Sequence, residues 1–519
     1  MSTALYLLIF GWLFVIVWVP VVILSQKKTH PGALFTLFFT ELWERFSFYG
    51  MRAFLIFYMT KQLFDQIQDG TADAKAYGIY GAFNALLYAA PIVGGMIADK
   101  ILGFRKTIIY GGLMMASAQF VLAYNSYFGN DNETLFFLGL ALLAIGNGFF
   151  KPNISSFLGT FYDRNDKRKD SAFTIFYMGI NIGAFLAPIT CGYLAQEVHW
   201  SLGFLAAGLG MLLGLVVFYN NMSKYEDKGN PPNPEGLKTQ KFLGLPVEVA
   251  IILVTILCIP IFSFLINAEG ITSYLLIIVG LGVIGYIFFT SFTSEDREEG
   301  QRLLVFIALF IFHMLFWVLF EQAGGSLNVL TERYVNKHGI AASQFQSVNA
   351  LLIILLAPVF TWIWLQLGKR NLEPRSPIKF FLALLQMALG YWIIVLGVKS
   401  GLATGAEIPV LFLILMYFFH TTGELSLSPV GLSLVTKLSP AKTVGFIMGA
   451  WFLSIAFAHK IGGYLGQLIA SPAAGTDRVS ELNGFVDVYM QWGVYIVLGA
   501  SAVLLAISPW LKKWSHGVN

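Results

Sequence analysis

Residues 41–52, with the sequence ELWERFSFYGMR, place four charged side chains inside an apolar run that is long enough to cross a membrane. On a helix that advances 100° per residue, these charges and Tyr49 fall on one face, within an arc of about 140°. A charge at the centre of a bilayer costs at least roughly 2.5 to 3.5 kcal/mol, so this face must lie against protein or water. Beside a wet cavity, such groups could bind a charged ligand or exchange protons, as a transport path requires. The four charged residues are Glu41, Glu44, Arg45 and Arg52.

Two further ions, Lys151 and Glu424, lie deep in other apolar runs without an opposite charge in their own segment. A buried unpaired ion is expected to find a partner or to change its protonation state. We therefore predict that Lys151 pairs with Glu424, and Arg52 with Glu321, when two halves of the protein close together. The alternative is a set of permanent pairs, which stabilise a fold poorly compared with apolar packing. Lys460 is expected to extend along its own stem to the membrane surface.

The composition indicates a membrane protein. Of the 519 residues, 57% are hydrophobic and 12% are charged, whereas about 25% of the residues in soluble proteins are charged. A net charge of +4 gives no indication of nucleic-acid binding. Cys191 and Cys258 both lie in apolar runs, so we expect neither a disulfide framework nor a metal site.

Apolar runs of about 20 residues predict fifteen transmembrane helices. They lie near residues 4–24, 33–60, 76–98, 105–124, 134–158, 171–195, 201–220, 246–266, 272–292, 303–333, 344–367, 376–398, 407–437, 442–470 and 486–511. Of the 33 Lys and Arg residues, 23 lie in one set of alternate connections, 6 in the other set and 4 in apolar runs. The positive-inside rule then predicts a cytoplasmic carboxy terminus and an amino terminus outside the cell.

These runs predict an all-α transmembrane chain in four parts. The run at 4–24 lacks a basic amino-terminal region and a cleavage site, so residues 1–28 are expected to hold a retained extra helix. Six-helix bundles are predicted over residues 29–222 and 301–519. Between them, residues 223–300 hold a polar linker and two surplus runs, which we interpret as an inserted hairpin.

The segment GGMIADKILGFRKT at residues 94–107 would form a tight cytoplasmic turn. It resembles a loop signature of the major facilitator superfamily. In that signature an acid and basic residues, here Asp99, Arg105 and Lys106, form a charge network that joins helix ends.

The segment ELWERFSFYG at residues 41–50 matches the pattern ExxERFxYYG except at Phe48, which keeps an aromatic wall but removes a hydroxyl. Further segments are FFKPNISSFLG at 149–159, FYMGINIGA at 176–184, FWVLFEQAGGSL at 316–327 and GELSLSPVGLS at 423–433. Together they resemble the proton-coupled oligopeptide transporter (POT/PTR) family, bacterial type, of the major facilitator superfamily. The resemblance runs from about residue 34 to residue 513.

The resemblance implies uptake of di- and tripeptides in symport with protons, by alternating access, in the inner (cytoplasmic) cell membrane. It implies no cofactor besides the proton and no nucleic-acid partner. The implied proton-coupling residues are Glu41, Glu44, Arg45, Arg52, Lys151, Glu321 and Glu424. The implied substrate-binding residues are Arg45, Tyr49, Arg52, Tyr88, Lys151, Tyr177, Asn181, Trp317, Glu321, Asn349, Glu424, Ser428 and Trp451.

The charges themselves agree with this assignment. An extended di- or tripeptide spans about 7 to 11 Å, so cations on one wall of a cavity and carboxylates on the other could hold both of its termini. Glu41 and Glu44 are the candidates for the coupling proton, because the protonation of a poorly solvated carboxylate depends on whether a cation stays beside it. His420 could join them, whereas His313 and His459 are expected to be packing residues.

Two other functions remain open. A relative that moves nitrate or another small anion would have the same fold, but Glu321 and Glu424 favour a zwitterionic substrate. A transport-inactive peptide sensor would be expected to have lost Glu41 or Glu44, and both are present. No nucleophile and base set, phosphate-binding loop or metal-ligand spacing indicates an enzyme.

Overall fold

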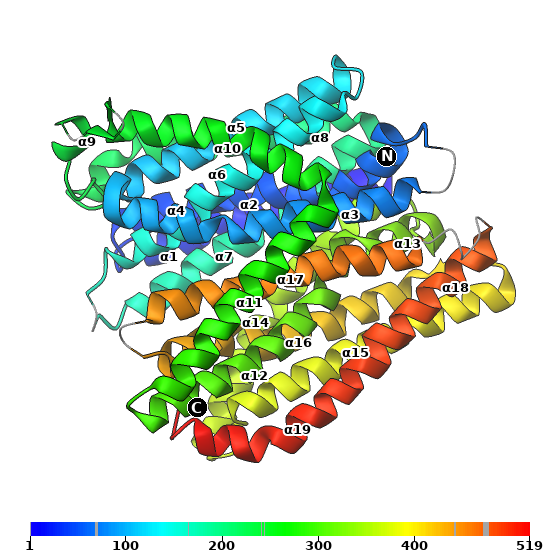
Figure 1. Ribbon diagram of the computed structural model, residues 1–519. Helices are drawn as coiled ribbons and strands as arrows, with labels where there is room; N and C mark the ends of the chain where they lie inside the picture. The colour runs from blue at the N-terminus through cyan, green and yellow to red at the C-terminus, as the bar shows by residue number, and fades with distance from the viewer. Residues whose placement is uncertain are drawn as a thin grey trace. The chain divides into compact units, whose positions relative to one another are not determined.

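The computed structural model describes residues 2–67, 71–163, 166–239, 241–242, 244–440, 443–470 and 477–518, without the side chains of 238, 428–430 and 432–433. Helices make up nearly all of its regular structure (Figure 1). The α-helices are α1 (Thr3–Gln26), α2 (Gly32–Tyr58), α3 (Ala72–Ala89), α4 (Pro91–Ile97), α5 (Gly103–Tyr127), α6 (Glu133–Gly159), α7 (Lys169–Ala187), α8 (Trp200–Asn220), α9 (Gly236–Thr239), α10 (Val247–Asn267), α11 (Glu269–Thr293), α12 (Arg297–Phe320), α13 (Ser326–Tyr334), α14 (Ser347–Lys369), α15 (Ser376–Thr404), α16 (Val410–Leu438), α17 (Val444–Ile469), α18 (Arg478–Val488) and α19 (Val497–Trp514).

Other helical turns and short strands connect or interrupt these helices. The π-helical turns are η1 (Met59–Leu63), η2 (Ala98–Leu102), η3 (Pro188–Gly192), η4 (Leu194–Val198) and η9 (Tyr489–Ile496). The 3-10 turns are η5 (Met222–Tyr225), η6 (Glu321–Gly324) and η7 (Ala342–Gln346). Strand β1 (Lys241–Phe242) pairs antiparallel with β2 (Leu245–Pro246), and β3 (Val335–Asn336) pairs parallel with β4 (Ile408–Pro409).

Each of the fifteen predicted apolar runs overlaps at least one helix of the described residues. Within the described residues, 13 helical segments are long and apolar enough to cross a membrane. One of them, Ala72–Tyr127, has 56 residues and contains two of the predicted runs, 76–98 and 105–124. The remaining run lies on α2, which is not among the 13 because it carries the charges of residues 41–52. The chain is therefore a multi-pass membrane protein.

The contacts divide the chain into two units, which we describe one at a time. Unit 1 comprises residues 1–66, 86–268 and 338–350. Unit 2 comprises residues 67–85, 269–337 and 351–519. The domain boundaries predicted after residues 28, 222 and 300 stay predictions.

In unit 1, α2 packs against α7 and α8, and α5 packs against α6 and α8. Glycine permits the close approach of α5 and α6, because a β-carbon on Gly111 would lie 2.6 Å from the carbonyl oxygen of Gly146. The extra helix α1 contacts α7 and η3, where Trp12 Nε1 donates a hydrogen bond of 2.9 Å to Thr190 Oγ1. Helix α10 packs on α6.

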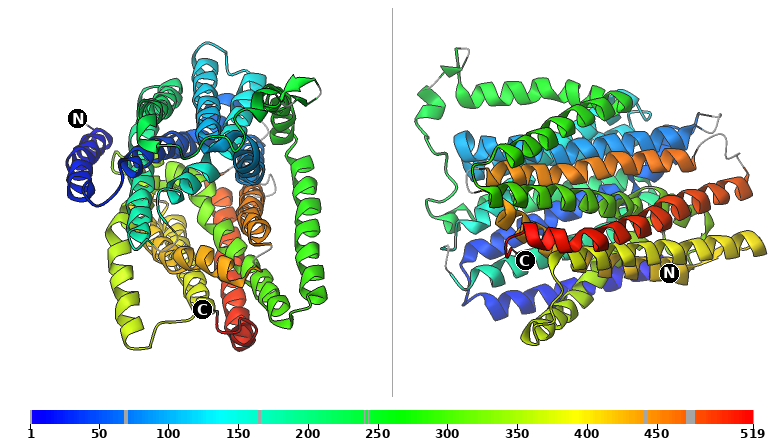
Figure 2. Two further views of the ribbon diagram at one scale, coloured as in Figure 1. Left: turned by 90° about the vertical axis from the view of Figure 1, so that its left-hand side faces the viewer. Right: turned by 60° about the horizontal axis from the view of Figure 1, so that its bottom comes forward.

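In unit 2, α15 packs against α16 and α19, and α12 packs against α17. Figure 2 shows α19, in red, beside α15, in yellow. Helix α11 packs against α12 and α17. The two helices of the predicted hairpin therefore belong to different units, α10 to unit 1 and α11 to unit 2.

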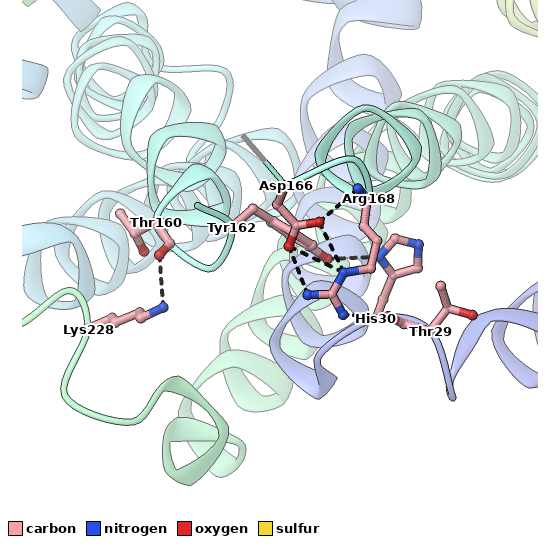
Figure 3. A network of polar contacts seen from close by, with 7 residues as sticks. All are labelled: Thr29, His30, Thr160, Tyr162, Asp166, Arg168 and Lys228. Carbon is pink, nitrogen blue, oxygen red and sulfur yellow. Dashed lines mark hydrogen bonds and ion pairs between the residues drawn. The ribbon is translucent and has the colours of Figure 1, made fainter. Parts of the chain in front are cut away.

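His30 is buried in the connection before α2, where it contacts the connection between α6 and α7 and the first turn of α7 (Figure 3). His30 Nδ1 lies 3.0 Å from the Tyr162 hydroxyl, and Nε2 lies 3.0 Å from Ser171 Oγ. Burial, and then the positive charge of Arg168, lower the pKa of His30 from its usual value. A neutral ring can donate from one nitrogen and accept at the other, which suits its two hydroxyl partners.

Two further contacts extend this network (Figure 3). Arg168 Nη2 forms an ion pair of 2.8 Å with Asp166 Oδ2, and Nη1 donates to the carbonyl oxygen of Thr29 at 3.0 Å. Lys228 Nζ, from the linker after α8, donates to the carbonyl oxygen of Thr160 at 2.9 Å. The network thus holds the connection before α2, the connection after α6 and the linker together.

The network should make unit 1 sensitive to mild acid through His30. Because the folded state holds the neutral ring, its stabilisation is complete above pH 6.5 and is lost as the pH falls through 6.5 toward the lowered folded-state pKa. We expect His30→Asn to reduce the fall in melting temperature between pH 8 and pH 5, measured on the purified protein in detergent. His199→Asn, a change at a histidine outside this network, is the control. An unchanged pH dependence in His30→Asn would contradict this prediction.

Candidate functional site

The charged face of α2 forms an ion cluster inside unit 1. Arg45 Nε lies 2.9 Å from Glu41 Oε1 and 2.5 Å from Glu44 Oε2. Solvent reaches at most 3% of each of these residues. One guanidinium therefore faces two carboxylates, so the three residues carry a net negative charge when both acids are ionised.

Neighbouring helices hold this cluster through a polar contact and a close approach. Asn147 Nδ2 of α6 donates a hydrogen bond of 3.4 Å to Glu44 Oε1. Gly183 of α7 lies so close to α2 that a β-carbon there would be 2.3 Å from the Leu42 carbonyl oxygen and 2.9 Å from Arg45 Cβ. The segment FYMGINIGA thus needs glycine at position 183 because α7 packs directly against the charged helix.

Aromatic rings accompany the cations of unit 1. Tyr49 lies between two arginines on the same helix face, with its ring centroid 6.0 Å from Arg45 Cζ and 5.7 Å from Arg52 Cζ. Lys151 Nζ of α6 lies 3.9 Å from the ring centroid of Tyr88. These distances allow cation–π attraction between the cations and the rings.

The other predicted residues of unit 1 lie on α7 and α14. Asn181 is buried, and its Nδ2 donates to the carbonyl oxygen of Tyr177 at 2.9 Å. The Tyr177 side chain is 43% exposed. Asn349 is half-buried in the first turns of α14. The predicted site residues in unit 1 are Glu41, Glu44, Arg45, Tyr49, Arg52, Tyr88, Lys151, Tyr177, Asn181 and Asn349.

In unit 2, the helix that carries Glu321 is broken at this residue. Helix α12 ends at Phe320, the 3-10 turn η6 follows, and Gly325 leaves the helical conformation with φ −112° and ψ −112°. Glu321 is buried, and its Oε1 lies 3.8 Å from His459 Nε2 of α17. His459 was expected to be a packing residue, but it faces a predicted site carboxylate.

A polar chain ties the broken helix to its neighbours. Gln322 Nε2 donates to the carbonyl oxygens of Val318 and Gly462, each at 3.1 Å. Ser326 Oγ donates to Gln322 Oε1 at 2.6 Å and lies 2.9 Å from the Tyr489 hydroxyl. Irregular backbone at membrane depth needs such internal partners.

His313 connects the two predicted tryptophans of unit 2. Its Nδ1 lies 2.7 Å from Ser454 Oγ, and its Nε2 accepts a hydrogen bond of 2.8 Å from Trp317 Nε1. The ring centroid of Trp451 lies 4.0 Å from that of His313. The expectation that His313 is a buried residue with satisfied partners holds, but it also fixes the positions of both tryptophans.

Lys460 has a partner that the sequence did not predict. It is buried on α17 and forms an ion pair with Glu269 at the start of α11. Gln467 Nε2 donates to the same carboxylate, at Oε1, with a distance of 2.8 Å. The expectation that Lys460 reaches the membrane surface along its own stem stays a prediction, and the presumed insertion supplies its counter-charge.

The remaining predicted residues of unit 2 lie on α16. Glu424 is buried, and Ser428 has a side chain outside the described ones. His420 is buried with its ring centroid 5.0 Å from that of Tyr391 on α15. The predicted pairs of Lys151 with Glu424 and of Arg52 with Glu321 each join a residue of unit 1 to a residue of unit 2, and they stay predictions.

The loop signature at residues 94–107 binds the linker and α10. Gly103 begins α5 with φ +71°, and Arg105 Nε donates to the carbonyl oxygen of Lys228 at 2.7 Å. Lys106 Nζ forms an ion pair of 2.6 Å with Glu248 in the first turn of α10. In unit 1 the basic residues of the signature thus hold the linker and the first helix of the hairpin.

Four residues contact predicted site residues or buried charges in ways that were not predicted from the sequence. One signal was available for Asn147, which lies one helical turn before Lys151 and so shares its face. His313 likewise lies one helical turn before Trp317, its partner on α12, whereas Glu269 and His459 have partners on distant segments, which spacing along the chain does not indicate. The four residues are Asn147, Glu269, His313 and His459.

Comparison with known proteins agrees with this architecture. The sequence model of the POT family matches residues 105–481. The chain is 36% identical to the uncharacterized transporter YclF of Bacillus subtilis (strain 168), over 94% of this chain and 96% of the relative. It is 34% identical to the peptide transporter YePEPT of Yersinia enterocolitica subsp. palearctica, over 92% and 94%. It is 33% identical to the dipeptide and tripeptide permease A of Cronobacter turicensis, over 94% of each.

Solved structures give the same result. A crystal structure of the peptide transporter POT with sulfate is 34% identical and aligns with a TM-score of 0.77 over 93% of this chain and 96% of that one. A POT family transporter with 5-aminolevulinic acid is 32% identical, with a TM-score of 0.77 over 93% and 97%. The expected all-α major facilitator fold and the expected family are confirmed. This chain belongs to the POT family.

Proposed function

We propose that this protein takes up di- and tripeptides together with protons by alternating access. The observation that carries the proposal is the buried cluster on α2, in which Glu41 and Glu44 share the guanidinium of Arg45. Relatives named as a peptide transporter and as a dipeptide and tripeptide permease match nearly the whole chain and support this substrate class.

A short peptide is a zwitterion, so its transporter has to compensate both a carboxylate and an ammonium group. In our proposal the substrate carboxylate is bound by cations of unit 1, and the amino terminus by Glu321 or Glu424 of unit 2. Arg45 Nη2 is buried and has no hydrogen-bond partner among the described residues, so it offers a donor that a carboxylate can use. The cations of unit 1 are Arg45, Arg52 and Lys151.

Proton coupling follows from the shared guanidinium. When a substrate carboxylate competes for Arg45, Glu41 and Glu44 lose part of their counter-charge, and their protonation becomes linked to substrate binding. Inward movement of one proton charge releases about 2.3 kcal/mol per 100 mV. A tenfold accumulation of substrate requires about 1.4 kcal/mol, so one proton per peptide suffices.

We propose the inner (cytoplasmic) cell membrane as the location, with the carboxy terminus in the cytoplasm and the amino terminus outside. The bias of Lys and Arg toward one set of connections supports this orientation. The lipid bilayer and protons are the other partners, and no cofactor besides the proton is proposed.

Uptake driven by a proton gradient tests this function. In proteoliposomes with an inward proton gradient, labelled dialanine should accumulate, and collapse of the gradient should abolish the accumulation. Glu44→Gln should abolish it too, because the variant cannot release or bind the coupling proton, while exchange of peptide across the membrane should partly remain. Glu235→Gln, a matched change at an exposed residue of the linker, should accumulate dialanine normally.

Equal uptake by the wild type without a gradient would contradict symport, and normal accumulation by Glu44→Gln would contradict the role of this residue. Excess unlabelled dipeptide should compete with labelled dialanine, and excess nitrate should not.

The predicted pair of Lys151 and Glu424 can be tested with a double-mutant cycle. If the two side chains meet during transport, Lys151→Ala and Glu424→Ala should together reduce the uptake rate less than the product of their separate effects. Strictly additive free-energy changes would indicate that the two charges never interact. Lys151→Ala combined with Glu235→Ala is the control pair.

His313 is expected to position the tryptophans that bind the substrate. His313→Leu removes the bonds to Ser454 and Trp317, and the loss of one such bond costs about 0.5 to 1.5 kcal/mol. The KM for a dipeptide should therefore rise roughly two- to tenfold, measured by uptake in proteoliposomes. Ser454→Ala removes only one of these bonds and should have a smaller effect. An unchanged KM in His313→Leu would contradict the positioning role.

A further inference from the structure

A cavity of about 310 Å³ opens at one end of unit 2. It lies where α12 and α15 begin and where α16 and α19 end, so it belongs to the membrane-surface level of these helices. Its volume is in the range of about 300 to 1,000 Å³ that small-molecule sites have. The residues on which the argument depends are Val305, Leu309, Arg375, Ser376, Ser508 and Lys512.

The cavity is positively charged. Arg375 and Lys512 are its only charged lining residues, and neither has an acidic partner within the described part of the chain. Lys379, one turn into α15, differs because Glu373 lies 2.5 Å from its Nζ. Two exposed cations without counter-charge make this cavity attractive to an anion.

Polar groups that also favour an anion line the same cavity. Helix α15 begins at Ser376, and its first turn contains no acidic residue, so the positive end of its dipole faces the cavity. Ser376, Ser508 and Ser515 add hydroxyl groups to the lining. The cavity therefore combines two cations, three hydroxyls and a helix amino terminus, all of which favour a phosphate group.

The rest of the lining is apolar, which distinguishes a lipid from a free ion. Val305 and Leu309 of α12 and Leu511 of α19 are buried and line the cavity. Trp510, beside them on α19, is 59% exposed, as is typical of an aromatic residue at the membrane surface. A free phosphate would gain nothing from an apolar wall, whereas the glycerol and first acyl carbons of a lipid would be buried there.

We propose that this cavity binds the phosphate headgroup of an anionic phospholipid such as phosphatidylglycerol, with its glycerol end against the apolar wall. Basic pockets between transmembrane helices at the cytoplasmic surface suit such headgroups. The proposed orientation of the chain places the cavity in the inner leaflet. Lipid binding here does not depend on the substrate, so it can be tested without a transport assay.

Lipid binding to the purified full-length protein can be measured by native mass spectrometry in detergent, with phosphatidylglycerol or phosphatidylcholine added in steps. We expect phosphatidylglycerol to bind and phosphatidylcholine to bind more weakly. Arg375→Gln and Lys512→Gln should each weaken phosphatidylglycerol binding about fivefold, and together about 30-fold. Ser508→Met, which fills the cavity without changing its charge, should weaken binding as well.

The matched control is the double variant Arg370→Gln with Lys513→Gln. It removes two neighbouring positive charges that do not line the cavity, and phosphatidylglycerol binding should change less than twofold. An equal loss in this control would overturn the proposal, because binding would then reflect the general surface charge. Inorganic phosphate that displaces the lipid at millimolar concentration would also overturn it, in favour of a free-phosphate site. Normal phosphatidylglycerol binding by the variant with both Arg375→Gln and Lys512→Gln would overturn the proposal too.

Discussion

The structure of unit 1 depends on the burial of three ions on one helix. Glu41, Glu44 and Arg45 lie where solvent is nearly absent, so each charge must be compensated by another side chain within a few ångströms. Asn147 of α6 adds a polar contact to the cluster, and Gly183 leaves the room that α7 needs to pack against the helix that carries it. Because one guanidinium faces two acids, Arg45 alone cannot neutralise the cluster when both carboxylates are ionised.

In unit 2, backbone peptide groups also need buried partners. The helix break after α12 exposes peptide groups that a continuous helix would satisfy; Gln322 donates to the carbonyl oxygen of Val318, and Ser326 holds the Gln322 side chain. His313 and His459 bring further polar groups to this region. Regular helices carry the chain across the bilayer, whereas the irregular turn and its polar neighbours surround Glu321, a residue to which the family resemblance assigns a function.

Much of this architecture could be predicted from the sequence. Long apolar runs predict the helices because each run must span a fixed hydrocarbon thickness, and the charges of α2 stand out within such a run. Partners were harder to predict. Lys460 meets Glu269 across about 190 residues of chain, and His459 meets Glu321 across about 140, so only tertiary packing brings each pair together. Glu269 also lay in a presumed connecting turn, where an acidic residue is ordinarily solvated.

The hairpin has a mechanical consequence. Helix α10 ends at Asn267 and α11 begins at Glu269, so a single residue, Ala268, joins a helix packed on unit 1 to a helix packed on unit 2. Ion pairs fasten both arms, with Glu248 holding the first and Glu269 the second. A single residue spans at most about 3.6 Å, so the facing ends of the two arms stay within a few ångströms of each other whatever else changes in either unit.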